Sequence, residues 1–171
     1  LAQRGVTSVT LDWRGTLFEG ASHLSSWDAQ EVGAYEGEVG PMAIDAGRTY
    51  EGANDFYSDS PARVAQVFAQ ALGAAGINAT LGEAGEPPAG AAALATVSSA
   101  TMGEQLRWML AHSDNTLADQ YCRFAARAAG APATYEGATS TVASTLSAAG
   151  VPTEGLFLED CSGLSSNDRI S

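Results

Sequence analysis

The pattern of apolar and polar positions divides the chain into an N-terminal part with short extended segments and a C-terminal part with helices. Residues 5–13 are rich in β-branched and aromatic residues, which is typical of a strand. Residues 38–44 form another extended stretch, in which Pro41 indicates an edge strand or a bulge. Between them, residues 19–36 are rich in Gly, Ser and acidic residues, and we expect an ordered surface loop there.

A helix is predicted where Ser60 can act as the N-cap and Pro61 suits the first turn. Apolar residues then recur on one face at helical spacing, namely Val64, Val67, Phe68, Ala71 and Leu72. Gly76 ends this helix. Further extended segments are expected at residues 77–81 and 91–98, on either side of a loop that is rich in Pro and Gly.

Three more helices are predicted in the C-terminal half. Residues 101–104 have the form of a capping box, and the helix that follows carries a stripe expected to be buried, Leu106, Met109 and Leu110. After a break at residues 113–115, a second helix carries the stripe Leu117, Tyr121, Phe124, Ala125 and Ala128. A third spans residues 139–149. Because strands come first and helices later, the pattern favours an α+β fold over an alternating βαβ arrangement.

Composition narrows the possible partners. The net charge is −12, and the basic residues are eight arginines with no lysine. Such a charge opposes nucleic-acid phosphates and anionic membranes, so we predict neither as a partner; a solubilising acidic surface is the simplest explanation. No apolar run approaches the length of a membrane span, so no transmembrane segment is predicted in this chain.

The tripeptide Ser113-Asp114-Asn115 is the strongest candidate for chemistry. A corner between two helices can aim a hydroxyl and an amide into a cleft, where they relay a proton or hold a substrate's peptide group in acyl transfer. The same three residue types are also common at helix ends, because their side chains bond to free backbone N–H groups. The tripeptide alone leaves both interpretations open.

Other catalytic and metal-binding patterns are weak. His23 and His112 lie far apart, and neither Cys122 nor Cys161 belongs to a C-x-x-C pair, so no metal site and no catalytic cysteine are predicted. No Gly-rich phosphate loop is present either. We therefore expect no cofactor.

Two blocks in the C-terminal half resemble a known family. Residues 109–119 resemble the S-D-N region of the peptidase S13 D-alanyl-D-alanine carboxypeptidases, the penicillin-binding protein 4 type, with Asp119 where that family usually has Glu. Residues 158–165 resemble the family's Leu-x-Asp-Gly-Ser-Gly-Leu-Ser, with Cys161 in place of a glycine. Upstream, residues 9–12 and 40–45 resemble the insertion typical of the family, so the similarity covers nearly the whole chain.

The resemblance implies a fold and a division into domains. The fold would be α+β, with the helical part of a transpeptidase domain like that of penicillin-binding proteins and serine β-lactamases. Residues 1–50 would belong to a β-rich insertion domain. Residues 51–171 would form the partial transpeptidase-like domain that carries the S-D-N motif.

The resemblance also assigns roles to individual residues. Ser113 matches the serine that shuttles a proton near the nucleophile and the leaving group, and Asn115 matches the amide that contacts the substrate's backbone. Asp114 would brace the corner. Trp27 and Tyr35 resemble an aromatic pair that helps to hold the end of the peptidoglycan stem peptide, although simple loop packing explains them equally well. Gln30 stands where the family often has an acid for a substrate amine.

The implied activity is that of a serine-type D-Ala-D-Ala carboxypeptidase/endopeptidase. It would act on peptidoglycan stem peptides outside the cytoplasm through an acyl-serine intermediate and would react with β-lactam antibiotics. A chain without lysine has neither the S-x-x-K nor the K-T-G signature, and arginine cannot replace lysine as a base. We therefore expect an inactive central piece of a longer enzyme. A non-catalytic module that binds cell-wall peptides or another cell-wall partner is the alternative.

Cys122 and Cys161 are predicted to form a disulfide. Cys161 occupies a position where the resemblance leads one to expect glycine, and an even number of cysteines in an exported chain favours a bridge. Two separately buried thiols are the alternative, because cysteine is common in protein cores.

Overall fold

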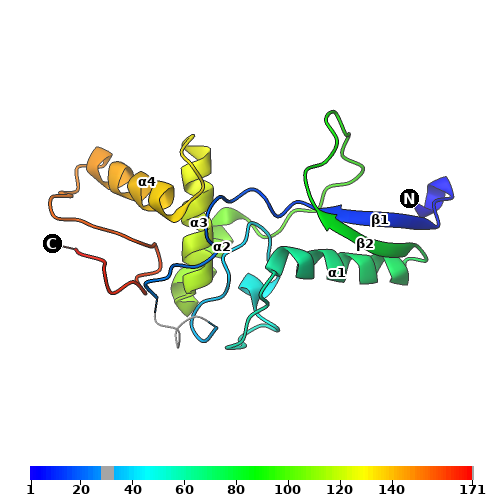
Figure 1. Ribbon diagram of the computed structural model, residues 1–171, viewed down its shortest axis with the longest axis horizontal. Helices are drawn as coiled ribbons and strands as arrows, with labels where there is room; N and C mark the ends of the chain where they lie inside the picture. The colour runs from blue at the N-terminus through cyan, green and yellow to red at the C-terminus, as the bar shows by residue number, and fades with distance from the viewer. Residues whose placement is uncertain (28–32, 171) are drawn as a thin grey trace.

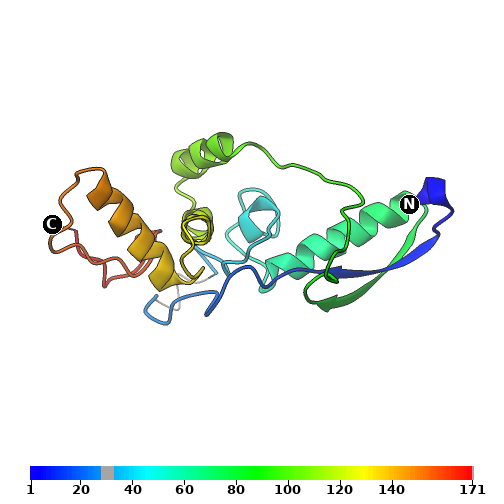
Figure 2. The same ribbon diagram turned by 90° about the horizontal axis from the view of Figure 1, so that it is seen from above.

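The computed structural model describes residues 1–27 and 33–170. These residues form an elongated molecule, with a β–α–β unit at one end and a group of helices at the other (Figures 1 and 2). The elements follow one another as η1 (Ala2–Arg4), β1 (Ser8–Trp13), η2 (Asp45–Gly47), α1 (Ser60–Ala74), β2 (Asn78–Ala84), α2 (Met102–His112), α3 (Asn115–Ala128) and α4 (Tyr135–Ala148). The described part of the chain is thus α+β.

The two strands pair in parallel, with Ser8 opposite Asn78 and Leu11 opposite Leu81. Parallel strands need a long crossover, and α1 lies in that crossover and packs on the sheet (Figure 1). The prediction of strands first and helices later is therefore wrong at this end, where the order is β–α–β. The pairing also joins strands from the two ranges that were predicted to belong to separate domains.

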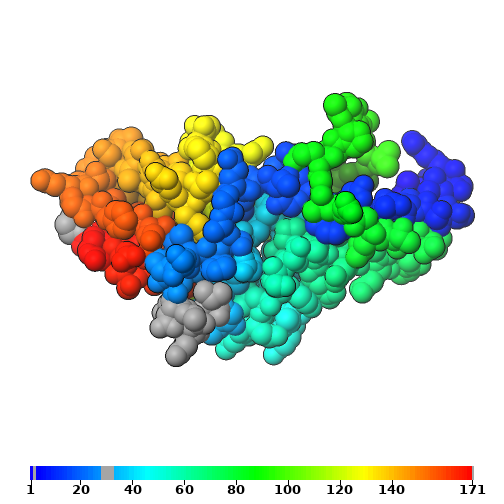
Figure 3. Space-filling model, in the orientation of Figure 1, coloured from blue at the N-terminus to red at the C-terminus, as the bar shows by residue number. Residues whose placement is uncertain are grey.

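Two predicted extended segments contain no strand. Residues 38–44 are irregular, and their backbone bonds instead to other loops, as when Val39 N–H donates to the Ser22 carbonyl at 2.8 Å. Residues 91–98 are exposed, and the chain that follows β2 projects from the surface (green in Figure 3). Within residues 1–27 and 33–50, β1 is the one strand that the structure contains.

Helix caps decide where the helices begin. The N-cap of α1 is Asp59 rather than Ser60, because the Asp59 carboxylate accepts from the Ala62 N–H at 2.9 Å. The capping box of α2 is confirmed: Thr101 and Glu104 bond reciprocally to each other's backbone N–H groups. Helix α4 begins at Tyr135, four residues before its predicted start, because Thr134 caps it.

Helix α3 buries its polar face. The side chains that it buries are Thr116, Asp119, Gln120, Arg123 and Ala126. The apolar stripes predicted for α2 and α3 are only partly covered, and Leu110 is 76% exposed, so its predicted burial is wrong. The other residues of these stripes, except Leu117, line an open groove of about 720 Å³. The reason is that irregular segments cover the opposite face of α3 and supply partners for its polar groups.

A small apolar core lies beside α3 and α4. Trp27, Val39 and Tyr135 form its buried centre, and Phe18, Leu24 and Leu164 pack around them. The rings of Trp27 and Tyr135 meet edge to face with centroids 5.6 Å apart. This core attaches the N-terminal loops to the helical end. Within the described ranges, no helix is both long and apolar enough to cross a membrane.

Candidate functional site

Ser113 lies between α2 and α3 in a left-handed backbone conformation, with φ 53° and ψ 50°. This conformation is uncommon for residues other than glycine, and it costs energy that the surrounding structure must offset. The Ser113 N–H bonds to the Met109 carbonyl and so closes α2. The residue is exposed, so the turn presents its hydroxyl at the surface.

Asp114 anchors this turn from the inside. It is buried and caps α3, accepting from the Leu117 N–H at 2.8 Å. Its other carboxylate oxygen forms an ion pair with Arg48, whose guanidinium lies over the Phe56 ring. A carboxylate held on both oxygens fixes the direction in which α3 leaves the turn. We call Ser113, Asp114 and Asn115 the S-D-N corner.

Residues 33–40, which we call the Tyr35 loop, lie along the first two turns of α3. Asn115 Nδ2 donates to the Tyr35 carbonyl at 3.2 Å, and Gly37 N–H donates to Thr116 Oγ1 at 3.0 Å. Further along, Gln120 Nε2 donates to a loop carbonyl. Because a carbonyl can only accept, the first contact sets the orientation of the Asn115 amide and leaves its Oδ1 and one N–H free of this bond.

The two candidate aromatic residues have different environments. Tyr35 is 63% exposed and lies next to the S-D-N corner through its backbone. Trp27 is only 5% exposed, and its indole N–H donates to Asp160 Oδ2 at 2.7 Å. This placement does not fit the predicted peptide-binding role of Trp27, because its side chain is enclosed by the core. Gln30 lies outside the described residues.

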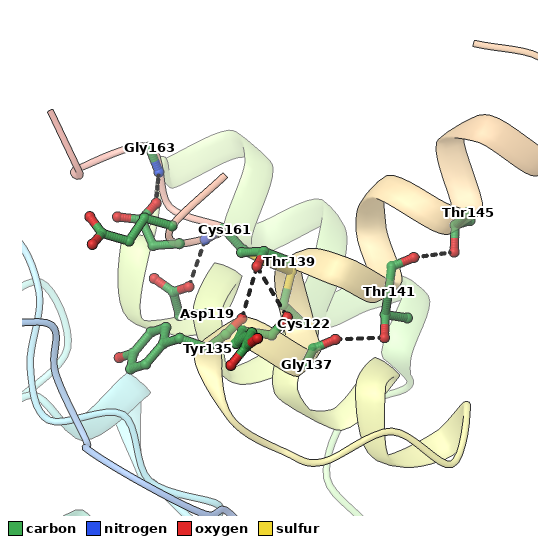
Figure 4. Close-up of a disulfide and its surroundings, with 12 residues drawn as sticks. Asp119, Cys122, Tyr135, Gly137, Thr139, Thr141, Thr145, Cys161 and Gly163 are labelled. Carbon is green, nitrogen blue, oxygen red and sulfur yellow. Dashed lines mark hydrogen bonds between the residues drawn. A yellow bond between two sulfur atoms is a disulfide. The ribbon is translucent and has the colours of Figure 1, made fainter. Parts of the chain in front are cut away.

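Beneath the corner lie three fully buried acids, Glu36, Asp119 and Asp160, which we call the buried acid cluster. Asp160 accepts from the N–H groups of Gly163 at 2.6 Å and Ser165 at 2.8 Å, in addition to Trp27. Asp119 Oδ1 accepts from the Cys161 N–H at 2.8 Å, and Figure 4 shows Asp119 pointing from α3 toward that backbone. The cluster therefore connects the Tyr35 loop, α3 and residues 158–165, which we call the C-terminal segment.

Burial shifts the titration of two of these acids. Loss of solvent, followed by the charge of Asp119, raises the pKa of Glu36 to about 11. Loss of solvent also raises the pKa of Asp119 to about 6, opposed by the hydrogen bond from Cys161. Both shifts are upward, so burial favours retention of a proton on this pair.

Arg123 connects the polar face of α3 to two loops. Its guanidinium donates to the carbonyls of Ala133 at 2.9 Å, Ala21 at 3.0 Å and Glu19 at 2.6 Å. The guanidinium carbon also lies 4.7 Å from the Phe18 ring centroid and 4.9 Å from that of Tyr135. Burial lowers the pKa of this guanidinium. The arginine organises the core on which the site rests.

The structure contains a disulfide between Cys122 and Cys161, with their Cα atoms 6.5 Å apart (Figure 4). It ties the middle of α3 to the segment that also carries Asp160. Among residues 1–27 and 33–170, no three or more His, Cys, Asp or Glu side chains are arranged to hold a metal ion.

Sequence reasoning assigned no role to four charged residues that organise this region: Glu36, Arg48, Arg123 and Asp160. Asp160 stands inside a block that resembles the family, but one sequence does not reveal that its carboxylate is buried. A weak signal did exist in α3, where Thr116, Asp119, Gln120 and Arg123 recur at helical spacing. Such a polar stripe normally faces solvent, and the opposite is true here.

Known proteins resemble this chain in sequence. The sequence model of the D-Ala-D-Ala carboxypeptidase 3 (S13) family matches residues 53–171. Carboxypeptidase DacB of Mycolicibacterium smegmatis is 34% identical over 171 residues, covering 97% of this chain and 36% of that protein. Carboxypeptidase Rv3627c of Mycobacterium tuberculosis is 34% identical over 176 residues, covering 100% of this chain and 37% of that protein. The chain thus spans little more than a third of these two relatives.

Proposed function

Since the chain belongs to the D-Ala-D-Ala carboxypeptidase 3 (S13) family, we propose that it contributes the S-D-N corner to a serine-type D-Ala-D-Ala carboxypeptidase/endopeptidase. In that reaction a serine oxygen attacks the carbonyl carbon of the penultimate D-Ala, and the bond to the terminal D-Ala breaks. Water then hydrolyses the acyl-serine ester. Ser113 passes a proton to the departing amine, and Asn115 holds the peptide group of the substrate.

The corner itself is the observation that carries this proposal. An exposed hydroxyl on a left-handed turn, an amide with a fixed orientation and a buried carboxylate beneath them make a rigid surface group. A rigid donor and acceptor pair stabilises a transition state at little cost in reorganisation. A left-handed residue often follows a helix, and after α1, α3 and α4 it is a glycine. After α2 it is a serine, and an ordinary helix boundary does not need the bond from Asn115 to another segment.

Under this proposal, the nucleophile belongs to a longer protein that contains these 171 residues. The sequence has no lysine, so neither the S-x-x-K serine with its base nor the K-T-G strand is among them. The two relatives named above are long enough to hold such segments. We propose that this chain forms part of the helical region of the penicillin-binding-protein-like domain.

The proposed substrate is the stem peptide of peptidoglycan, with β-lactams as ligands of the longer enzyme. Its place of action would be outside the cytoplasm, in the cell envelope or secreted. The Cys122–Cys161 bond supports this location, because structural disulfides persist in oxidising compartments. Tyr35, exposed beside the corner, is the aromatic residue best placed to contact the peptide.

The test is acylation by a fluorescent penicillin of the longer protein that contains this chain. Ser113→Ala or Asn115→Ala should lower the acylation rate about a hundredfold or more, since removing such a group costs about 3–4 kcal/mol of transition-state stabilisation. Asp114→Ala should act partly through stability, because the α3 cap and the Arg48 pair are lost together. Near-normal acylation of Ser113→Ala with a lower melting temperature would reduce the corner to a helix boundary.

A second candidate is a module that binds cell-wall peptides without cleaving them, which the absence of lysine favours. The 171-residue chain should form no covalent adduct with fluorescent penicillin under either proposal. If the longer protein also forms none and has no Ser-x-x-Lys sequence, the binding module stands and the enzyme proposal is wrong.

A further inference from the structure

We propose that Glu36 is a positioning residue for the S-D-N corner: its protonated carboxyl, shared with Asp119, holds the Tyr35 carbonyl against the Asn115 amide. The catalytic importance of that amide rests on the proposed function. The shared proton and its effect on the Tyr35 loop do not, so the two can be tested apart.

Glu36 lies in the middle of the Tyr35 loop. Tyr35 and Gly37 both bond to the beginning of α3, the first through its carbonyl and the second through its N–H. Glu36 stands between these two bonds with its side chain fully buried, whereas the ring of Tyr35 is exposed. The depth at which the Glu36 carboxyl is held therefore sets where the Tyr35 carbonyl meets Asn115.

The loop has little freedom to adjust in another way. A Cβ atom at Gly37 would lie 2.5 Å from the Phe56 ring, so the backbone passes directly against that side chain. Phe56 in turn lies under the guanidinium of Arg48, which is paired with Asp114. The Tyr35 loop is thus held against Phe56, and the S-D-N corner is held by Arg48 above the same ring. The remaining constraint on the loop is the buried side chain of Glu36.

The carboxyl groups of Glu36 and Asp119 have too few hydrogen-bond donors. Glu36 Oε1, Glu36 Oε2 and Asp119 Oδ2 are buried without a well-formed hydrogen bond to the described residues. Two ionised carboxylates in contact would repel and would leave all three atoms unsatisfied. A proton on Glu36 that is donated to Asp119 removes the repulsion, and Asp119 Oδ1 is already occupied by the Cys161 N–H.

The groups around Glu36 favour retention of that proton. Burial and the negative charges of Asp119 on α3 and Asp160 on the C-terminal segment raise the pKa of Glu36, while the Ser162 hydroxyl lowers it. Tyr135 on α4 also faces the cluster, and burial raises its pKa above the ordinary range, so it stays neutral. Among these groups, Arg123 is the cation whose charge attracts Asp119. Its guanidinium donates its hydrogen bonds to loop carbonyls and not to the carboxylate.

Removal of the proton would have a structural consequence. Two negative charges would then share a site without solvent, and expulsion of the Glu36 side chain is the direct way to relieve them. The Tyr35 carbonyl would leave Asn115 with it. Glutamine at position 36 should act like the protonated acid, because its amide N–H can donate to Asp119 as the carboxyl does. Alanine has no donor and cannot form this bond.

NMR of the isotope-labelled 171-residue chain tests this without any catalysis. We expect the Glu36 carboxyl carbon to resonate at the protonated position at pH 8; the ionised position would overturn the proposal. The side-chain amide signals of Asn115 should keep their wild-type positions in Glu36→Gln and shift in Glu36→Ala. Glu38→Ala is the matched control, since Glu38 lies in the same loop but bonds to Ser22 and His23.

Equal shifts of the Asn115 signals in the Glu38 and Glu36 alanine variants would also overturn the proposal, because any loop change would then suffice. If Glu36→Ala does not fold, two measurements still test the proposal: the position of the Glu36 carboxyl signal in the wild type and the Asn115 amide signals in Glu36→Gln.

The role in catalysis is tested by acylation of the longer protein. Glu36→Ala should slow acylation about tenfold or more at pH 8, whereas Glu36→Gln should stay near wild type and lose less of its rate at alkaline pH. If the NMR results are as expected and both variants acylate normally, the positioning role is wrong. If Ser113→Ala and Asn115→Ala also acylate normally, the proposed function is wrong and the shared proton stands.

Discussion

Helices α1 and α3 are similar in length, with 15 and 14 residues, but they bury opposite kinds of side chain. Helix α1 turns its apolar stripe toward a two-stranded sheet that covers it incompletely, so Phe68 remains 52% exposed. Helix α3 turns its polar stripe inward, where Arg123 donates to loop carbonyls and Asp119 accepts from the Cys161 N–H. A hydrophobic stripe therefore locates a helix in this chain but does not identify its buried face.

The two ends of the molecule differ in the same way. At the β–α–β end no residue of β1 or β2 is fully buried, and stability there depends on partial burial of apolar side chains. At the helical end, specific polar contacts and a disulfide hold three segments that are distant in sequence. Buried polar groups are strongly directional and costly to leave unpaired, so they give a more sharply defined arrangement than partial apolar contact.

At a single pH, the largest expected effect is loss of the disulfide at the helical end. Cys122 and Cys161 are 39 residues apart, and closing a loop of this size contributes roughly 4 kcal/mol to the free energy of unfolding. Urea denaturation with and without reductant measures it on the 171-residue chain. A Cys122→Ser, Cys161→Ser double variant should match the reduced protein. Equal midpoints for the oxidised and reduced chains would show that the disulfide does not stabilise the helical end.

Arg123→Ala should lower the free energy of unfolding by about 3 kcal/mol, because three carbonyls, one of them in a buried bond and two in partly buried bonds, lose a charged donor. The same denaturation experiment measures the loss. Arg107→Ala on the exposed side of α2 is the matched control and should stay within about 0.5 kcal/mol of wild type. Similar losses in both variants would mean that the buried polar face is not what holds this end.

Glu36→Gln should change how stability depends on pH. The folded-state pKa of Glu36 is raised to about 11 from an ordinary value of 4.5, so the folded chain binds more protons between these values. The wild type should therefore lose stability relative to the variant as pH rises above about 4.5, by at most about 1.4 kcal/mol per pH unit. Urea denaturation at pH 5, 7 and 9 measures the trend. Exposed Glu136→Gln is the control for loss of a surface carboxylate. A difference in unfolding free energy between wild type and Glu36→Gln that stays constant with pH would contradict the shared proton.

The smallest effect is expected at the β–α–β end. Phe68→Ala should cost roughly 1 kcal/mol, well below the loss typical of a fully buried phenylalanine, because half of the side chain is already in water. Exposed Gln66→Ala on the same helix serves as the control. A loss as large as that of Arg123→Ala would show that this end is held as tightly as the other.

Local features of the sequence predicted much of what the structure contains. The capping box before α2 and the break at residues 113–115 follow from contacts within a few residues. The strands near residues 8 and 78 follow from the local run of β-branched residues. The family follows from two short blocks. The strand pairing, the environment of Trp27 and the buried acid cluster do not follow, because each depends on segments dozens of residues apart.

The sequence by itself therefore determined which residues could form the S-D-N corner and that no lysine accompanies them. Only the tertiary structure decided that α3 is buried through its polar face and that Asn115 is set by the Tyr35 carbonyl. It also decided that Glu36 and Asp119 meet. The physical reason is that the polarity of a side chain sets the free-energy cost of burying it, whereas the hydrogen-bond partners that offset this cost come from segments that only the fold brings together.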